Sequence, residues 1–338
     1  MDTADTTDQE RPASRPRRVL VTGATGYVGS RLVPTLLEAG HHVLAASREE
    51  TGTSDYPWDG EVETRRFDIE DADLVREAVE GVDVVVYLVH SRESEDFARK
   101  DREAAERVAT ACADAGVEQV VYLSGLVPPG ELSEHLRSRR EVEDVFLDAP
   151  VPATVLRASM VVGAGSTSYE LLRRLSERIP LLTPVPSWMR SRIQPVAIED
   201  VVHVIARALA PTDDPAARNR HYDLGGDEVL TYPELLALFA SVAGLRRYRF
   251  LVPWVPQRLV GWACARISGL KVTEVTSLVE SLRHDMVCGE DDLRRDLLED
   301  GYEFTGTAEA LRRSLDDDGA PGTTRRGDVQ SAAATDPA

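Results

Sequence analysis

Residues 18–48 read R-V-L-V-T-G-A-T-G-Y-V-G-S-R-L-V-P-T-L-L-E-A-G-H-H-V-L-A-A-S-R, and this stretch decides the fold. The apolar run 19–21 predicts a parallel strand that is covered on both faces. Glycines then recur at every third position. Gly23 allows the tight turn that leaves the strand, and Gly26 lets the backbone approach a bound group. Gly29 lets the following helix lie close to the strand.

A helix and a second strand complete this unit. Apolar residues recur at helical spacing after the last glycine, and Gly40 is suited to end the helix before a strand at 42–46. Pro34 inside the helix should kink it or cost about 3 kcal/mol. Strand, glycine turn, helix and strand in this order are the context in which such a turn holds a diphosphate at the helix N-terminus. The sequence therefore predicts dinucleotide binding by Gly23, Thr25, Gly26, Tyr27, Val28 and Gly29.

The rest of the chain alternates strands and helices, which predicts an α/β fold of the Rossmann type with a doubly wound parallel sheet. Further strands are expected at 61–67, 82–89, 119–123, 153–156 and 221–224. We expect a nucleotide-binding domain over 17–245, with substrate-side insertions at 158–195. A smaller, mostly helical C-terminal lobe is expected over 246–315. The polar stretches 1–16 and 316–338 have the composition of disordered tails.

The composition restricts the partners. The net charge of −19 disfavours nucleic acid, because phosphate contacts need clustered Lys and Arg. An acidic surface of this kind is typical either of a highly soluble protein or of adaptation to high salt. The 3 cysteines are far apart and lack metal-site spacing, so neither a metal nor a disulfide framework is expected. No secretory signal or membrane-spanning run is predicted, so we expect a cytoplasmic protein with a small-molecule substrate.

Several segments carry a resemblance to a known family. The turn T-G-x-x-G-x-x-G resembles that of extended and atypical short-chain dehydrogenases/reductases. Four further segments resemble the atypical NAD(P)H-binding branch of this family. They are Y-L-V-H-S at 87–91, S-E-H-L-R-S-R-R-E-V-E at 133–143, V-V-G-A-G-S-T-S-Y-E at 161–170 and R-I-Q-P-V-A-I-E-D-V at 192–201. This branch is related to nitrogen-metabolite-repressor-like proteins and to the 39-kDa accessory subunit of respiratory complex I. The resemblance runs from Arg18 to about Leu315.

Cofactor contacts are expected at the ends of three further strands. Arg48 follows the second strand, where an Arg suits the 2′-phosphate of NADP and a carboxylate would suit NAD. Two carboxylates, Glu49 and Glu50, follow directly and weaken this argument. We therefore expect NADP, with NAD as the alternative. The resemblance implies that Asp68, with Ile69, accepts from the adenine amino group; a plain helix-start charge is the alternative. Ligands of open sheets bind at the carboxyl edge, which favours contacts from Leu88, Val89 and His90. The alternative for His90 is a histidine that is hydrogen-bonded to loop carbonyls.

The catalytic residues depart from the family pattern. Short-chain dehydrogenases pair a Ser with Tyr-x-x-x-Lys, in which the Tyr transfers the proton and the Lys binds ribose. Ser124 stands at the position of the family Ser, Arg139 at that of the Lys and His135 at that of the Tyr. Arg139 can bind ribose hydroxyls but cannot donate a proton. His135 is either a general acid or a surface histidine.

The substrate side is expected to combine aromatic walls with two guanidinium groups. Such a wall suits an anionic or quinone-like ligand, unless the arginines pair with surface carboxylates. The expected residues are Met160, Ser166, Ser168, Tyr169, Trp188, Arg190, Arg192 and Gln194.

Two functions remain open on the sequence. One is an NADP-dependent reductase, epimerase or dehydratase acting on a small carbonyl or quinone-like substrate. The other is a non-catalytic NAD(P)H-binding redox sensor or an assembly factor, associated peripherally with a membrane complex. The intact glycine turn supports both functions, whereas the missing Tyr-x-x-x-Lys favours the second. The sequence does not determine the oligomeric state.

Overall fold

The computed structural model describes residues 15–49, 52–89, 96–130, 132–179, 182–210, 218–252, 255–316 and residue 329. Most of the two predicted tails lies outside these residues. Within them, no helix combines the length and the apolar character needed to cross a bilayer.

The described part of the chain contains a seven-stranded parallel sheet in the order β11-β6-β5-β4-β1-β2-β3. Its strands are β1 (Arg18–Thr22), β2 (His42–Ser47), β3 (Glu63–Arg66), β4 (Val84–Tyr87), β5 (Gln119–Gly125), β6 (Ala153–Ala158) and β11 (Arg220–Leu224). The chain winds outward from β1 in one direction through β3 and then returns to β4 and winds the other way. The switch lies between β1 and β4, where doubly wound folds bind their ligands.

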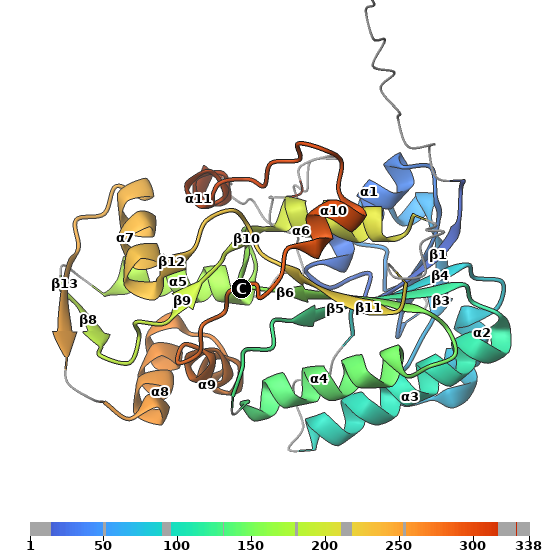
Figure 1. Ribbon diagram of the computed structural model, residues 1–338, viewed down its shortest axis with the longest axis horizontal. Coiled ribbons are helices and arrows are strands. Elements are labelled where there is room, and N and C mark those ends of the chain that lie inside the picture. The colour runs from blue at the N-terminus through green and yellow to red at the C-terminus, as the bar shows by residue number, and fades with distance from the viewer. Residues whose placement is uncertain are drawn as a thin grey trace, which may run out of the picture.

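Helices cover both faces of the sheet (Figure 1). One face carries α1 (Gly29–Glu38) and α6 (Ile198–Ala208), and the other carries α2 (Ala72–Val79), α3 (Phe97–Ala115) and α4 (Glu134–Leu147). Successive strand residues point to opposite faces, so Val19 and Val21 join the core under α1 while Leu20 joins the core under α3. Both faces are buried, which explains the continuous apolar runs in the sequence.

Most of the remaining elements form a lobe beyond the carboxyl ends of the strands, at the left of Figure 1. Helix α10 instead lies beside α6, and its Leu293 is buried in the core under α1 and α6. Short two-stranded sheets pair β10 with β7, β12 with β9 and β13 with β8. The strands are β7 (Val161–Val162), β8 (Leu182–Pro186), β9 (Arg192–Ile193), β10 (Val196–Ala197), β12 (Leu230–Thr231) and β13 (Tyr248–Val252). The helices are α5 (Thr167–Arg178), α7 (Tyr232–Val242), α8 (Gln257–Ser268), α9 (Val272–Ser281), α10 (Asp292–Leu297) and α11 (Thr307–Asp316).

The predicted α/β class, the doubly wound parallel sheet and the helical C-terminal part are confirmed. The segment 246–315 contributes β13 as well as the helices α8 to α11, and β13 pairs with β8 from the predicted insertion 158–195. Leu311 of α11 returns to a core that it shares with Phe239 of α7 and Tyr169 of α5. The predicted nucleotide-binding domain 17–245 and the predicted lobe 246–315 therefore share a sheet and a core.

Helix α1 runs through Pro34 without interruption. Proline lacks the N–H that would reach the carbonyl of Ser30 one turn earlier, so that carbonyl needs another donor. The indole Nε1 of Trp58, from the loop between β2 and β3, donates to it at 3.3 Å. Trp58 is 4 % exposed, so this bond is shielded from water. The loop thus compensates for the missing N–H that made Pro34 unfavourable in the sequence.

This compensation predicts a coupling between positions 34 and 58. Trp58→Phe should lower the free energy of unfolding by about 1–3 kcal/mol, because the buried carbonyl of Ser30 loses its donor. In a Pro34→Ala background the backbone N–H at position 34 is restored, and the same change should cost about 1 kcal/mol less. Urea denaturation of the two single variants and the double variant measures this coupling. Strictly additive effects would show that Trp58 does not serve the carbonyl opened by Pro34.

Candidate functional site

The glycine turn between β1 and α1 is built by close backbone contacts. Gly23 has a φ of +72°, which favours glycine, and its carbonyl accepts from the N–H of Gly26 at 2.9 Å. A Cβ on Gly29 would stand 2.2 Å from the oxygen of Gly23, so no larger residue fits there. A Cβ on Gly26 would stand 3.2 Å from the same oxygen. The protein itself therefore constrains Gly26 less than Gly29, which agrees with a role for Gly26 on the ligand side.

The N-terminus of α1 is open to an anion. No side chain caps this helix, and its first turn holds no acidic residue. By contrast, side chains cap four other helices: Asp71 caps α2, Ser133 caps α4, Ser166 caps α5 and Thr231 caps α7. An uncapped helix start leaves N–H groups and the positive end of the helix dipole unneutralised. This terminus, next to the glycine turn, fits the diphosphate of a dinucleotide.

Two further contacts hold the turn in place. The Tyr56 hydroxyl donates to the carbonyl of Thr25 at 2.6 Å, and Tyr56 stacks on Trp58 with ring centroids 4.8 Å apart. The Thr22 hydroxyl donates to the Val86 carbonyl at 3.2 Å and accepts from the N–H of Leu88 at 3.1 Å. These residues were missed in the sequence. The aromatic pair Y-P-W at 56–58, inside an otherwise polar loop, is the signal that could have found the first contact.

Arg48 and Asp68 lie at the ends of neighbouring strands, because Ser47 of β2 is in register with Arg66 of β3. Arg48 is exposed and makes no hydrogen bond or ion pair within the described part of the chain. Asp68 accepts from the N–H of Glu70 at 2.9 Å, so its carboxylate also shapes the loop. The carbonyl of Ile69 accepts from Arg107 of α3. Arg48 is thus a cation at this edge that makes no ion pair within the described residues.

The end of β4 lies against the glycine turn. A Cβ on Gly23 would meet Val89 Cγ2 at 3.5 Å and Leu88 Cβ at 3.6 Å. Leu88 and Val89 are therefore brought together with the turn, as expected of cofactor-binding residues at a switch point. His90 lies outside the described residues.

Ser124 occupies the carboxyl end of β5. Its side chain is 5 % exposed, and its Oγ has no hydrogen-bond partner within the described residues. It is in register with Arg157 of β6, and Arg157 is neutralised by the buried Glu143 of α4 through an Nε bond of 2.9 Å. The guanidinium of Arg157 is therefore bonded to Glu143 and not to Ser124, so the serine hydroxyl can bond to a ligand.

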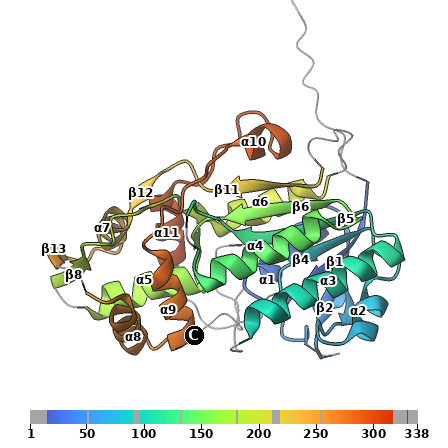
Figure 2. The ribbon, with the colours of Figure 1, turned by 60° about the horizontal axis from the view of Figure 1, so that its bottom comes forward.

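His135 and Arg139 continue the stripe of α4 that faces the sheet. Val142 and Phe146 of this stripe are buried in the core with Tyr122. Because α4 connects the parallel strands β5 and β6, it runs antiparallel to them, with its N-terminus at the carboxyl edge (Figure 2). Arg139 donates to the Tyr122 hydroxyl at 3.4 Å. His135 lies one helical turn closer to the N-terminus on the same side of α4, and it is half-buried.

The expected substrate wall is engaged largely in structural contacts. Arg192 pairs with Asp285 at 2.7 Å, and the Gln194 side chain donates to Gly226 and accepts from the N–H of Cys288. The Trp188 indole donates to the carbonyl of Val255, and Ser166 caps α5. These contacts hold the lobe together. For Arg192, pairing with a surface carboxylate is the alternative that the sequence offered, and for Arg190 no ion pair is found within the described residues. Arg190 is exposed, whereas Met160 and Ser168 are half-buried.

Tyr169 and the three cysteines are further groups that could react. Burial raises the pKa of the Tyr169 phenol above its usual range, and its hydroxyl has no partner within the described residues. Burial raises the pKa of Cys264 to about 11 and that of Cys112 and Cys288 to about 12, so these thiols stay protonated near neutral pH. The described residues hold no cluster of His, Cys, Asp and Glu suited to a metal ion.

A family described as NAD(P)H-binding matches residues 23–178, which span the glycine turn, Ser124 and α4. A (4-alkanoyl-5-oxo-2,5-dihydrofuran-3-yl)methyl phosphate reductase of Streptomyces griseus is 30% identical over 244 residues, covering 69% of this chain and 76% of that reductase. The chain belongs to the NAD(P)H-binding, atypical short-chain dehydrogenases/reductases. The nicotinamide cofactor predicted from the glycine turn is thereby confirmed.

Other relatives match over part of their length. A ceramide reductase of Caulobacter vibrioides is 29% identical over 185 residues, and the match spans 57% of that reductase. Three proteins of Mycobacterium match over 20% of their length. The chain thus spans about half or less of these relatives.

Solved structures show the same fold. The triphenylmethane reductase of Citrobacter sp., complexed with NADP(H), superposes with a TM-score of 0.70 at 18% identity. The superposition covers 88% of this chain and 100% of that one. An NADPH-dependent quinone oxidoreductase of Escherichia coli, complexed with NADPH, gives 0.68 at 19% identity, covering 87% and 98%.

The glycine turn predicts a sharp contrast between two glycine variants. Gly26→Val should abolish measurable binding of NADPH and NADH, because a branched side chain would fill the space expected for the diphosphate. Gly60→Val is the matched control, since a Cβ at Gly60 meets nothing within 4 Å. Calorimetric titration should show wild-type affinity for the control variant. Equal affinity of Gly26→Val and wild type would remove the turn from the cofactor site.

Proposed function

We propose that this protein is an NADPH-dependent reductase that delivers hydride to a carbonyl or quinone-like acceptor at the carboxyl edge of the sheet. The observation that carries the proposal is the buried hydroxyl of Ser124, which has no partner within the described residues. Ser124 lies two residues after Tyr122 on β5, and Tyr122 bonds to Arg139 of α4. The open N-terminus of α1 and the glycine turn fit the cofactor that the family binds. Relatives named as reductases support this class of reaction.

The preference for NADPH is supported by Arg48. Its guanidinium lies just beyond β2, where the adenosine ribose of such cofactors is expected, and it is unpaired within the described part of the chain. An arginine without a carboxylate partner suits a 2′-phosphate, which it can bind in a bidentate manner. The neighbouring Asp68 already accepts a loop N–H and so competes less for Arg48.

The chain's own residues have distinct roles in the reduction. When bound, the reduced nicotinamide would supply a hydride for the substrate carbon. Ser124 would donate a hydrogen bond to the substrate oxygen and hold it in place. His135, in its protonated form, would supply the proton that converts this oxygen to a hydroxyl. Arg139 would bind ribose hydroxyls, while its bond to Tyr122 fixes its direction.

A lipophilic acceptor fits the substrate side best. The side chains of Trp188, Arg192 and Gln194 are already hydrogen-bonded within the lobe, which leaves few polar groups for a highly polar substrate. One relative is named as a ceramide reductase, and two structures of the same fold are named as a quinone oxidoreductase and a triphenylmethane reductase. We therefore propose a substrate with an apolar body and a single reducible group.

A second function is supported by one feature. Arg139 replaces the family Lys and is held by the Tyr122 hydroxyl, so the usual proton-transfer pair is absent from the described helix α4. A protein that binds NAD(P)H without turnover could act as a redox sensor or an assembly factor. In that case the bound cofactor would stabilise the fold through linkage, with no requirement for a proton donor.

Arg48→Ala tests the cofactor preference. The affinity for NADPH should fall about tenfold to a hundredfold, the equivalent of about 1.5–3 kcal/mol for a charge-assisted contact. The affinity for NADH should stay the same, because NADH lacks the extra phosphate. Arg76→Ala on α2 is the control, since Arg76 is an exposed arginine that pairs with Asp73. Titrations with both cofactors decide the matter, and an equal loss for NADH would refute the role of Arg48.

Ser124→Ala and His135→Ala test the reaction. Each should lower kcat for NADPH oxidation about a hundredfold or more against responsive aldehydes, ketones or quinones, while the affinity for NADPH is kept. Unchanged turnover of His135→Ala would exclude it as the proton donor. Absence of turnover by wild type on the whole panel would favour the sensor or assembly function.

A further inference from the structure

Exposed apolar side chains are concentrated in one segment of the lobe. Among the described residues, the exposed large hydrophobic side chains other than Val229 all fall between positions 248 and 272. They are Tyr248, Phe250, Leu259, Trp262, Ile267 and Val272. Trp262 is 55% exposed and Tyr248 is 69% exposed. Such a concentration is typical of an interaction surface rather than of scattered surface residues.

The same segment is basic in an acidic chain. From Leu235 to Thr273 the sequence holds 5 arginines, 1 lysine and no Asp or Glu, whereas the whole chain has a net charge of −19. Arg258 and Arg266 are exposed, and neither forms an ion pair within the part of the chain that the structure describes. Elsewhere, exposed arginines such as Arg99 commonly pair with carboxylates. The segment therefore combines unneutralised positive charge with exposed apolar area.

Helix α8 arranges these groups on one face. Trp262 lies four residues after Arg258 and four before Arg266, and Leu259 lies three residues before Trp262, so all four share a side of the helix. We call Arg258, Leu259, Trp262 and Arg266 the outer face of α8. An adjoining side of the helix is packed, because Gly261 lies so close to α9 that an added Cβ would stand 3.2 Å from Thr276.

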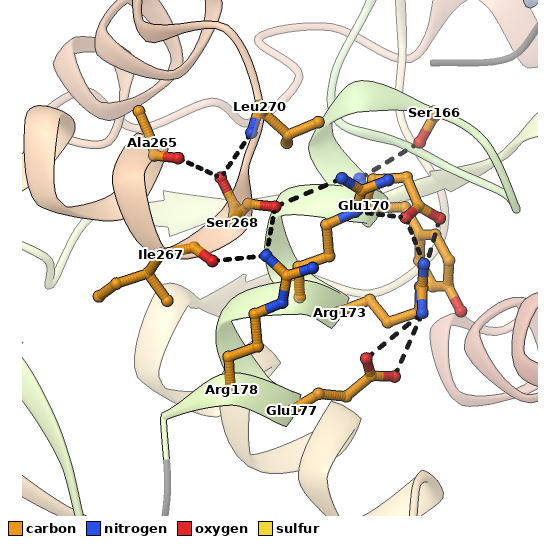
Figure 3. A network of polar contacts seen from close by, with 11 residues as sticks. Ser166, Glu170, Arg173, Glu177, Arg178, Ala265, Ile267, Ser268 and Leu270 are labelled. Carbon is orange, nitrogen blue, oxygen red and sulfur yellow. Dashed lines mark hydrogen bonds and ion pairs between the residues drawn. The ribbon is translucent and has the colours of Figure 1, made fainter. Parts of the chain in front are cut away.

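Helix α5 fixes the orientation of α8 (Figure 3). Arg178 donates to the carbonyls of Ile267 and Ser268 at 2.6 and 2.8 Å, and Arg174 donates to that of Ser268 at 3.3 Å. Two cations thus satisfy the C-terminal end of α8, where they also oppose its dipole. Glu170 holds Arg174 at 3.1 Å and completes the network. These bonds hold the C-terminal end of α8 against α5.

We propose that the outer face of α8 docks on an anionic membrane surface. Apolar side chains would enter the headgroup region, while Arg258 and Arg266 keep their charged ends at the lipid phosphates. A second copy fits less well, because a symmetric contact would bring the same unpaired cations together. An acidic protein would need carboxylates at matching positions, whereas lipid phosphates meet cations at any spacing. The lobe lies beyond the carboxyl ends of the strands, so docking would place the substrate side near the bilayer.

Vesicle co-sedimentation tests this proposal without reference to catalysis. Wild type should bind vesicles of phosphatidylcholine with phosphatidylglycerol, bind vesicles of phosphatidylcholine alone weakly, and dissociate as salt is raised. Arg258→Gln with Arg266→Gln should weaken binding about thirtyfold, the equivalent of about 2 kcal/mol at about 1 kcal/mol per cation. Leu259→Ser with Trp262→Ser should also weaken it. Arg99→Gln with Arg102→Gln on α3 removes the same charge elsewhere and should leave binding unchanged.

Other outcomes would overturn the proposal. All the changed side chains are exposed, so each variant should fold. Circular dichroism and NADPH titration check that it does. Failure of folded wild type to bind anionic vesicles, or equal weakening by the α3 control, would reject the outer face as a membrane contact. A dimer in sedimentation velocity that Trp262→Ser dissociates, without vesicle binding, would assign the face to a second copy. Because vesicle binding needs no turnover, its failure is distinguishable from failure of the proposed reductase.

Discussion

The cofactor end of this protein depends on the close contact between Gly29 and the carbonyl of Gly23. A single added carbon at Gly29 would stand 2.2 Å from that oxygen, so α1 can start this close to β1 only with glycine there. The contact places the uncapped N-terminus of α1 at the switch between β1 and β4. Tyr56 and Trp58 then supply donors to carbonyls of the turn and of α1, so that the tight geometry leaves these groups satisfied.

The main sheet could be predicted because its signals are local. Strands covered on both faces read as continuous apolar runs, and the connecting helices follow at regular intervals. The lobe could not be read in the same way. Its strands β7, β9, β10 and β12 are 2 residues long, too short for a periodic pattern. The pairing of β13 with β8 joins segments more than sixty positions apart, which no local pattern encodes.

The candidate site also has a part that could be predicted from local sequence and a part that could not. The glycines, Ser124 and the face of α4 follow from motif spacing, because each lies within one strand–helix unit. The partners of Arg192 and Gln194 do not, since Asp285 and Cys288 come from far along the chain. Their bonds turn an expected ligand-binding wall into a structural one. The donor from Trp58 to the carbonyl of Ser30 was likewise hidden, because Pro34 appears in the sequence only as an unfavourable residue.

The buried hydroxyl of Ser124 links the structure to the proposed function. A buried hydroxyl without a partner costs about 1–3 kcal/mol relative to a satisfied one, and alanine would fill nearly the same space without that cost. Stability alone therefore does not explain a serine whose Oγ is unpartnered within the described residues. A bound ligand with an acceptor oxygen removes the cost, because the hydroxyl then gains its missing bond. Arg157 beside it is already paired with Glu143, so the hydroxyl faces a locally neutral environment, which suits a carbonyl better than an anion.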